Sequence, residues 1–320
     1  MSLTSAVAFI ARRLGAMAVL LAVLSFAVFC LVYLAPGDAV DALLGGRPSS
    51  PELVATLKEE HHLDDPFFTQ YWLWAKDALR LDFGTSIQTT LPVTDEIGAR
   101  FGPSVLLGVY SYLLTLLFGV VPGVLAALRQ RRALDRGLVA GAVVALSTPP
   151  FVLGILLLYL FAIAVPVFPA AGKGQGLLDQ LWHLTLPAVA LALTVSAFLL
   201  RHTRASMIGV LSQDHVAFAR ARGLSTRRIM VRYLLRNALI PVVTVSGVML
   251  TYFVTGAVLV ETTFSLGGLG ELLVRSAESN DLPMLQGLTL MIAVIIISAN
   301  LLADLAYLAI DPRIRFERRA

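Results

Sequence analysis

Six long apolar runs alternate along the chain with segments that hold almost all of its charged residues. Each run approaches or exceeds the roughly 20 residues that an α-helix needs to cross a bilayer. The runs lie at 14–35, 104–128, 137–165, 184–200, 238–260 and 284–310, and Asp304 is the only formal charge inside them. The pattern predicts an all-α integral membrane protein with six transmembrane helices.

The basic residues of the connecting segments fall on one side of the predicted membrane. Of the 25 Lys and Arg residues, 18 lie in the two terminal tails, the second-to-third loop and the fourth-to-fifth loop. In contrast, 36–103 holds 11 acidic and 5 basic residues, and 261–283 holds 4 acidic and 1 basic. Short loops rich in Lys and Arg stay in the cytoplasm. We therefore predict that both termini are cytoplasmic.

These observations predict the domain organisation. An N-terminal tail with the first helix occupies 1–35, and an extracytoplasmic helical loop occupies 36–103. The remaining five helices form a core at 104–310, which includes a cytoplasmic loop at 201–237. A cytoplasmic tail follows at 311–320.

Composition supports a membrane protein and narrows its chemistry. Hydrophobic residues make up 57% of the chain and charged residues 14%, against about 25% charged in soluble domains. The basic pI near 9.4 reflects the loop asymmetry, and no module for nucleic-acid binding is present. Cys30 is the single cysteine, so an intrachain disulfide is impossible.

The long outer loop contains two predicted helices. Ser50 and Pro51 suit the N-cap and the first position of one helix, and 66–81 predicts a second. The second carries five aromatic residues, Phe67, Phe68, Tyr71, Trp72 and Trp74. Aromatic side chains of this kind suit the membrane interface, although they could also form a docking surface for another protein.

Prolines mark possible bends in the spans. Pro149 and Pro150 lie inside the third run, and Pro241 opens the fifth. Such residues free backbone groups that neighbouring helices or water must satisfy. Membrane helices tolerate them in general, but they are also candidates for a bend that gates a path.

The fourth-to-fifth loop predicts a helix, a glycine break and a second helix. Ser212 is a candidate N-cap, Asp214 suits the positive end of a helix over 213–222, and Gly223 suits its left-handed end. The second helix carries Arg228, Arg232 and Arg236 on one face. Small residues, Ala217, Ala219 and Ala221, would let the first helix enter a groove on a partner. The arginines alone could serve only to fix the topology.

Candidate chemistry is sparse. The glycines of 260–273 lack the Lys-Ser or Lys-Thr pair of a phosphate-binding loop, so a tight turn that leads into a short helix is expected. The histidines His61, His62, His183, His202 and His215 lack metal-ligand spacing. We therefore expect neither catalysis nor a metal site.

Five segments, in order, resemble the permease subunits of ABC transporters that import dipeptides, oligopeptides or nickel. They are YLAPGDAV, LDDPFFTQYWLW with LDFGTSI, ARARGLSTRRIMVRYLLRNALIPVVT, VETTFSLGGLGELL and LADLAYLAIDPRIR. The resemblance implies the type I, MetI-like permease fold. It also implies that the loop helix, with Asp214, Ala217, Ala219, Arg220, Ala221 and Gly223, docks on an ATPase. The family motif begins Glu-Ala-Ala, whereas this chain has Ala217, Phe218 and Ala219, so Arg220 or Arg222 is a candidate replacement for the glutamate.

The resemblance also implies an assembly in the bacterial cytoplasmic membrane. Its partners would be a second, related permease, two cytoplasmic ATPases and an extracytoplasmic solute-binding protein, within membrane lipid. ATP and magnesium would be bound by the ATPases and no cofactor by this chain. Dipeptides, oligopeptides, glutathione and nickel remain open as substrates. A standalone secondary transporter, with Asp304 as its span charge, is the alternative from another class.

Overall fold

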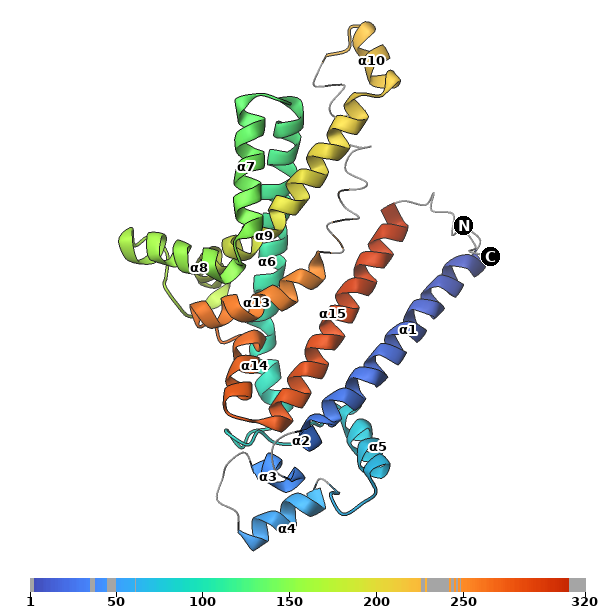
Figure 1. Ribbon diagram of the computed structural model, residues 1–320, viewed down its shortest axis with the longest axis vertical. Helices are drawn as coiled ribbons and strands as arrows, with labels where there is room; N and C mark the ends of the chain where they lie inside the picture. Colours follow the sequence, from blue (N-terminus) through green and yellow to red (C-terminus); the bar gives the residue numbers. More distant parts are fainter. Residues whose placement is uncertain are drawn as a thin grey trace. The chain divides into compact units, whose positions relative to one another are not determined.

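The computed structural model describes residues 3–34, 38–44, 50–60, 62–225, 228, 242, 245, 247 and 249–310. These residues are helical or irregular, apart from one isolated bridge between Thr85 and Pro92. Figure 1 shows the helices, which divide into two compact units. Unit 1 comprises Met1–Ser104 and Gly267–Ile297, and unit 2 comprises Val105–Leu266 and Ser298–Ala320. Two long helices, α6 and α15, contribute to both.

Unit 1 combines the first helix with the short helices of the predicted outer loop. Its complete helices are α1 (Leu3–Phe29), α2 (Leu31–Leu34), α3 (Ala39–Leu44), α4 (Pro51–Glu60), α5 (Phe67–Ala78) and α14 (Leu269–Glu278). It also contains the first part of α6 (Val93–Leu128) and most of α15 (Leu282–Ile310). The prediction of a helix that begins at Pro51 is confirmed, and the Ser50 carbonyl accepts from Val54 N–H at 3.0 Å. The helix predicted over 66–81 is α5, which ends earlier than predicted, at Ala78.

A buried carboxylate attaches the segment before α6 to α15 inside unit 1. Asp281 is 2% exposed and stands one residue before α15. Its Oδ1 accepts from the N–H groups of Ile87 (3.2 Å) and Met284 (3.3 Å), and its Oδ2 accepts from the Ser86 hydroxyl. The carboxylate therefore caps the helix and orders a distant turn at the same time.

The predicted aromatic cluster divides into two groups. Phe67, Tyr71 and Trp74 pack against Phe29 of α1, with ring centroids 5.5–5.7 Å apart. Phe68 and Trp72 are 75% and 70% exposed. Three of the five aromatic residues are therefore used in the packing of this unit, while Phe68 and Trp72 remain accessible. The interfacial and docking interpretations of the cluster stay predictions.

Unit 2 is built around α9. Its helices are the rest of α6, α7 (Ala133–Ser147), α8 (Pro150–Leu158), the π-helix η1 (Tyr159–Ala164), α9 (Gly176–Leu211), α10 (Asp214–Ala221) and α13 (Leu250–Phe264). In the most apolar 18-residue stretch of α9, 72% of the residues are buried, whereas the corresponding share in α6 is 22%. Ala188, Leu191, Val195, Phe253 and Phe264 are among the residues of the core that α9 shares with α13. The predicted fourth run, 184–200, covers only the middle of this 36-residue helix.

The third apolar run is bent rather than continuous. Thr148 (φ −104°, ψ 124°) and Pro149 (φ −58°, ψ 144°) are extended, and Pro150 then starts α8. The two helical parts meet at 105°. Since each residue before a proline is driven from helical to extended geometry, two prolines in succession produce a break of this kind. The prediction of one span over 137–165 is therefore corrected to a broken or re-entrant pair.

Four described helices are long and apolar enough to cross a membrane, or up to six if each of two bent pairs counts as one span. The four contain most of the predicted first, second, fourth and sixth runs. The fifth run, 238–260, lies partly outside the described residues. Arg232, Arg236 and Pro241 lie wholly outside them, so the predictions made for these three residues stay predictions. The predicted turn before α14 is present, with Ser265 and Gly267 at φ 48° and 65°.

Candidate functional site

The inner-side candidate begins where α9 ends. Ser212 closes α9, and its hydroxyl donates to the Gly209 carbonyl at 2.9 Å. The first carbonyl of α10 belongs to Gln213, which accepts from Val216 N–H at 3.0 Å. The prediction of Ser212 as the N-cap of the loop helix is therefore wrong by one residue, because its side chain serves the preceding helix. Asp214 occupies the first turn as predicted, where its charge suits the helix dipole.

Gly223 ends α10 as the sequence predicts. Its φ of +73° is left-handed, a conformation that residues with a Cβ rarely adopt. Leu224 N–H donates to the Ala219 carbonyl at 3.3 Å, and Arg222 N–H to that of Phe218 at 3.0 Å. The first of these bonds is typical of the Schellman helix end. The chain direction after α10 is thus fixed by a local hydrogen-bonded motif.

One face of α10 packs against its own unit. Val216 (0% exposed) and Ala219 (4%) join Met207, Val210 and Ala127 in one apolar cluster. The expected small-residue face therefore needs correction, because Ala219 points inward while Ala217 and Ala221 are exposed. A spacing of two residues places side chains on different sides of an α-helix. The side chain of Arg220 lies outside the described residues.

Phe218 is the exposed aromatic residue of this helix, with 67% of its surface accessible. It lies between the exposed Ala217 and the inward Ala219, in the place where the family motif has alanine. Sequence reasoning considered only the small residues and missed it. Phe218 is therefore a large apolar side chain that is available for contact with another molecule.

A charged pair attaches α7 to α9 near this end of unit 2. The Arg204 guanidinium donates to both carboxylate oxygens of Asp135, at 2.6 and 2.9 Å, and Arg131 N–H donates to the same carboxylate at 2.8 Å. The Asp135 side chain is 4% exposed. Asp135 stands in the first turn of α7, two residues before the apolar run that starts at 137. The pair therefore fixes the position of α7 along α9.

Two glycines allow α6 and α9 to approach closely. A Cβ on Gly119 would lie 2.7 Å from the Leu199 Cβ, and one on Gly123 would lie 2.7 Å from the Thr203 Cβ and 2.9 Å from the Leu200 carbonyl oxygen. The two glycines are four residues apart and share a helix face. Small residues at this spacing are the usual means of close helix packing in membranes.

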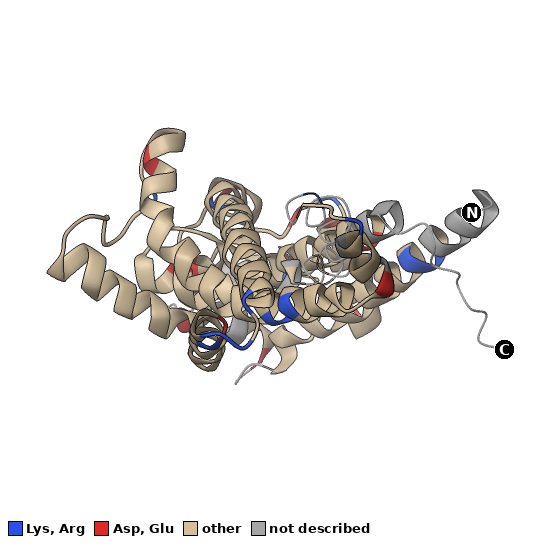
Figure 2. Ribbon diagram, turned by 90° about the horizontal axis from the view of Figure 1, so that it is seen from above, with Lys and Arg blue, Asp and Glu red and all other residues tan. Residues whose placement is uncertain are grey.

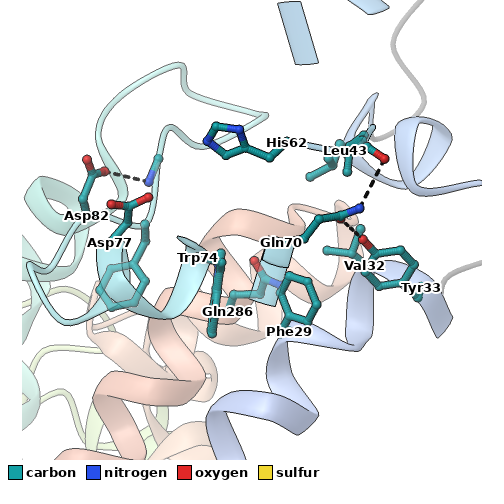
Figure 3. Close-up of a pocket in the computed structure, with 13 residues that line it drawn as sticks. Phe29, Val32, Tyr33, Leu43, His62, Gln70, Trp74, Asp77, Asp82 and Gln286 are labelled. Atoms are coloured by element: carbon teal, nitrogen blue, oxygen red, sulfur yellow. Dashed lines mark hydrogen bonds between the residues drawn. The ribbon is translucent and has the colours of Figure 1, made fainter. Parts of the chain in front are cut away.

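Unit 1 contains a cavity of about 150 Å³, shown in Figure 3. The Tyr33 hydroxyl donates to Gln70 Oε1, and Gln70 Nε2 donates to the carbonyls of Leu63 (3.2 Å) and Asp65 (2.7 Å). Asp77 and Asp82 line another part of the wall. The carboxylates favour a hydrogen-bond donor or cation over an anion in this cavity.

The described histidines are engaged locally. His62 Nδ1 lies 3.8 Å from Asp65, His183 Nδ1 lies 2.9 Å from the Asp179 carbonyl oxygen, and the His202 ring packs against Phe198 at an interplanar angle of 47°. In the part of the chain that the structure describes, no group of three or more His, Cys, Asp or Glu side chains could hold a metal ion. His61 and the side chain of His215 lie outside that part.

Comparison with known protein families identifies the kind of molecule that carries these features. The model of the family described as "Binding-protein-dependent transport system inner membrane component" matches residues 119–316. The model of the corresponding N-terminal region matches residues 6–108. The chain belongs to this family. It is therefore a multi-pass inner membrane permease, and the resemblance inferred from its five sequence segments is confirmed.

Full-length relatives are similar to this permease. A protein of Sinorhizobium fredii (strain NBRC 101917 / NGR234), named as the probable peptide ABC transporter permease protein y4tP, is 38% identical over 96% of this chain and 99% of its own. The glutathione transport system permease protein GsiC of Escherichia coli (strain K12) is 35% identical over 97% and 99%.

Solved structures show the same fold. Two crystal forms of the MetNI methionine ABC transporter, described as inward facing, contain a chain that matches 67% and 68% of the permease with TM-scores of 0.54 and 0.56. Each match covers 96% of the other chain at 15% and 18% sequence identity. The permease therefore has the MetI-like fold of type I ABC importers.

Proposed function

We propose that this permease is the membrane subunit of an ATP-driven importer of short peptides. The family supports transport that depends on a binding protein. Relatives named for peptide and glutathione transport support the substrate class, since glutathione is itself a tripeptide. The chain forms six spans, the fifth of them over 238–260, with both termini in the cytoplasm.

The single observation that carries the coupling mechanism is α10. It is a separate helix closed by Gly223, anchored to α9 by Val216 and Ala219, and it exposes Ala217, Phe218 and Ala221. A helix fixed on one side and exposed on the other transmits displacement as a rigid body. A partner ATPase that holds Phe218 would therefore move α9, the most buried long helix of unit 2.

The partners follow from this mechanism. Two cytoplasmic ATPases bind ATP and magnesium and hydrolyse the nucleotide, while this chain remains non-catalytic. A second, related permease completes the path across the membrane. An extracytoplasmic solute-binding protein delivers the peptide. The bend at Pro149 and Pro150 is a candidate for a gate, which would require α7 and α8 to change their angle during transport.

Reconstitution tests the proposed function. The permease is placed in proteoliposomes with its partner permease, its ATPases and its binding protein, and uptake of labelled dipeptides and of glutathione is measured. We expect uptake that requires ATP and the binding protein. Uptake by this chain alone under an ion gradient would instead make it a secondary transporter and would contradict the proposal.

Phe218→Ala tests the coupling contact. We expect ATP-dependent uptake to fall at least about tenfold, because truncation of a central aromatic anchor commonly costs about 2 kcal/mol or more of binding free energy. The control is Leu134→Ala, which removes an exposed large apolar side chain from the start of α7, outside α10. Full assembly of the complex with unchanged uptake for Phe218→Ala would remove α10 from the mechanism.

A further inference from the structure

A depression between α7 and α9 combines basic and apolar walls within unit 2. It has a volume of about 490 Å³ and is lined by Val139, Phe198, Arg201, His202, Arg204 and Ala205. The turn between α6 and α7, with the exposed Arg129, Arg131 and Arg132, lies at the same end of this unit (Figure 1). Figure 2 is viewed from this end and shows Lys and Arg in several of the nearest segments.

The depression lies at the depth where the apolar runs meet polar sequence. Val139 is among the first residues of the run 137–165, and Arg201 directly follows the run 184–200. Two antiparallel helices therefore reach the edge of the hydrocarbon layer at the same point, one entering it and one leaving it. A ligand held here has one end among acyl chains and the other among headgroups.

The basic groups of the depression have different surroundings. Arg204 is neutralised by Asp135, with oxygen–nitrogen distances of 2.6 and 2.9 Å. Arg201 is exposed, and in the described part of the chain no acidic group is paired with it. The His202 ring is held on Phe198 with centroids 4.3 Å apart. The depression thus carries a net positive charge centred on Arg201.

We propose that this depression binds the phosphate of an anionic phospholipid, with Arg201 as its principal contact. Basic recesses between helices on the cytoplasmic side of a membrane are suited to anionic headgroups. The guanidinium offers the planar donor fork that phosphate accepts. Val139 and Phe198 supply an apolar wall along which one acyl chain can lie, which a free phosphate ion would leave unused.

The test is native mass spectrometry of the complete transporter complex in detergent, incubated with phosphatidylglycerol or with phosphatidylcholine. We expect retained phosphatidylglycerol and little phosphatidylcholine. Arg201→Gln is expected to weaken retention about fivefold, the effect of one basic residue near an anionic surface, while Arg201→Lys keeps most of it. The control Arg129→Gln removes an arginine from the nearby turn and should retain the lipid.

Each other result overturns the proposal. Equal retention by Arg201→Gln means that the lipid is bound elsewhere, and equal loss in Arg129→Gln means that only the general positive field attracts it. If inorganic phosphate at about 10 mM, roughly a saturating concentration for a weak anion site, displaces the lipid, the site binds free phosphate instead. Transport is not the readout, so these outcomes leave the proposed function untouched.

Discussion

At the scale of single residues, two buried carboxylates hold distant segments of the chain together. Asp281 and Asp135 are both nearly inaccessible, and each joins segments that are far apart in sequence. A buried carboxylate is stable only when donors replace the water it has lost. Asp281 accepts from backbone N–H groups and the Ser86 hydroxyl, while Asp135 accepts from the Arg204 guanidinium and from Arg131 N–H. Replacing either carboxylate by an amide removes the charge and one of the two acceptor oxygens.

Asp135→Asn tests this view. The amide cannot accept from Arg204 and from Arg131 N–H as the carboxylate does, so we expect a loss of roughly 1–3 kcal/mol of stability. The measurement is the apparent melting temperature of the purified complex. Asp65→Asn is the control, because its pair with His62 is about half exposed, and it should change stability by less than about 0.5 kcal/mol. An Asp135→Asn complex that melts at the same temperature as the unaltered complex at neutral pH would show that the pair contributes nothing.

At the scale of helices, α9 is the element around which unit 2 is organised. It packs against α7 through Ala197 and Leu200, against α13 through Leu191 and Val195, and against α10 through Met207. Its approach to α6 needs the absence of a side chain at Gly119 and Gly123. Close packing of this kind leaves no room for a single additional methyl group.

Gly123→Ala is expected to separate α6 from α9. The new Cβ would meet the Leu200 carbonyl oxygen at 2.9 Å, and because this is backbone, a side-chain rotation cannot relieve the contact. We expect destabilisation of about 1–3 kcal/mol and lower yield of assembled complex on size-exclusion chromatography. Gly108→Ala on the same helix is the control, since a Cβ added there would have no other atom within 4 Å. Equal yields would show that the helices do not approach so closely.

At the scale of the whole molecule, the distribution of charge predicts the orientation. The 18 basic residues of the tails and the two inner loops oppose an acidic outer loop, and the positive-inside rule then predicts that α10 lies in the cytoplasm. That placement is what the proposed ATPase contact requires. The same rule predicts that α3, α4 and α5 lie outside, where the proposed binding protein would arrive.

Cysteine labelling tests this topology directly. Cys30 is the only natural cysteine, so Cys30→Ser gives a background without thiols. On this background Ala217→Cys is expected to react with a membrane-impermeant maleimide only after permeabilisation, and Leu79→Cys, whose residue is 88% exposed, in intact spheroplasts. Labelling of Ala217→Cys from outside would show that α10 faces the exterior, and it would contradict the proposed ATPase contact.

The sequence alone determined the features that depend on local order along the chain. Runs of apolar residues identify most of the membrane helices, because hydrogen bonding within one helix satisfies the backbone in lipid whatever its neighbours are. Gly223 predicts the end of α10, since a left-handed residue is needed there. Pro149 and Pro150 predict a bend in the same way, although not its size, which depends on the packing of α8 against α9.

Only the tertiary structure decided which side chains pack against, or pair with, other parts of the chain and which remain exposed to other molecules. Ala219 and Phe218 are adjacent in sequence, yet one is buried against Met207 and the other is exposed. Phe67 and Phe68 differ in the same way, because only Phe67 packs against α1, and Arg204 is neutralised while Arg201 is not. Most of these outcomes depend on a residue far away in the sequence, and local periodicity carries no information about such partners.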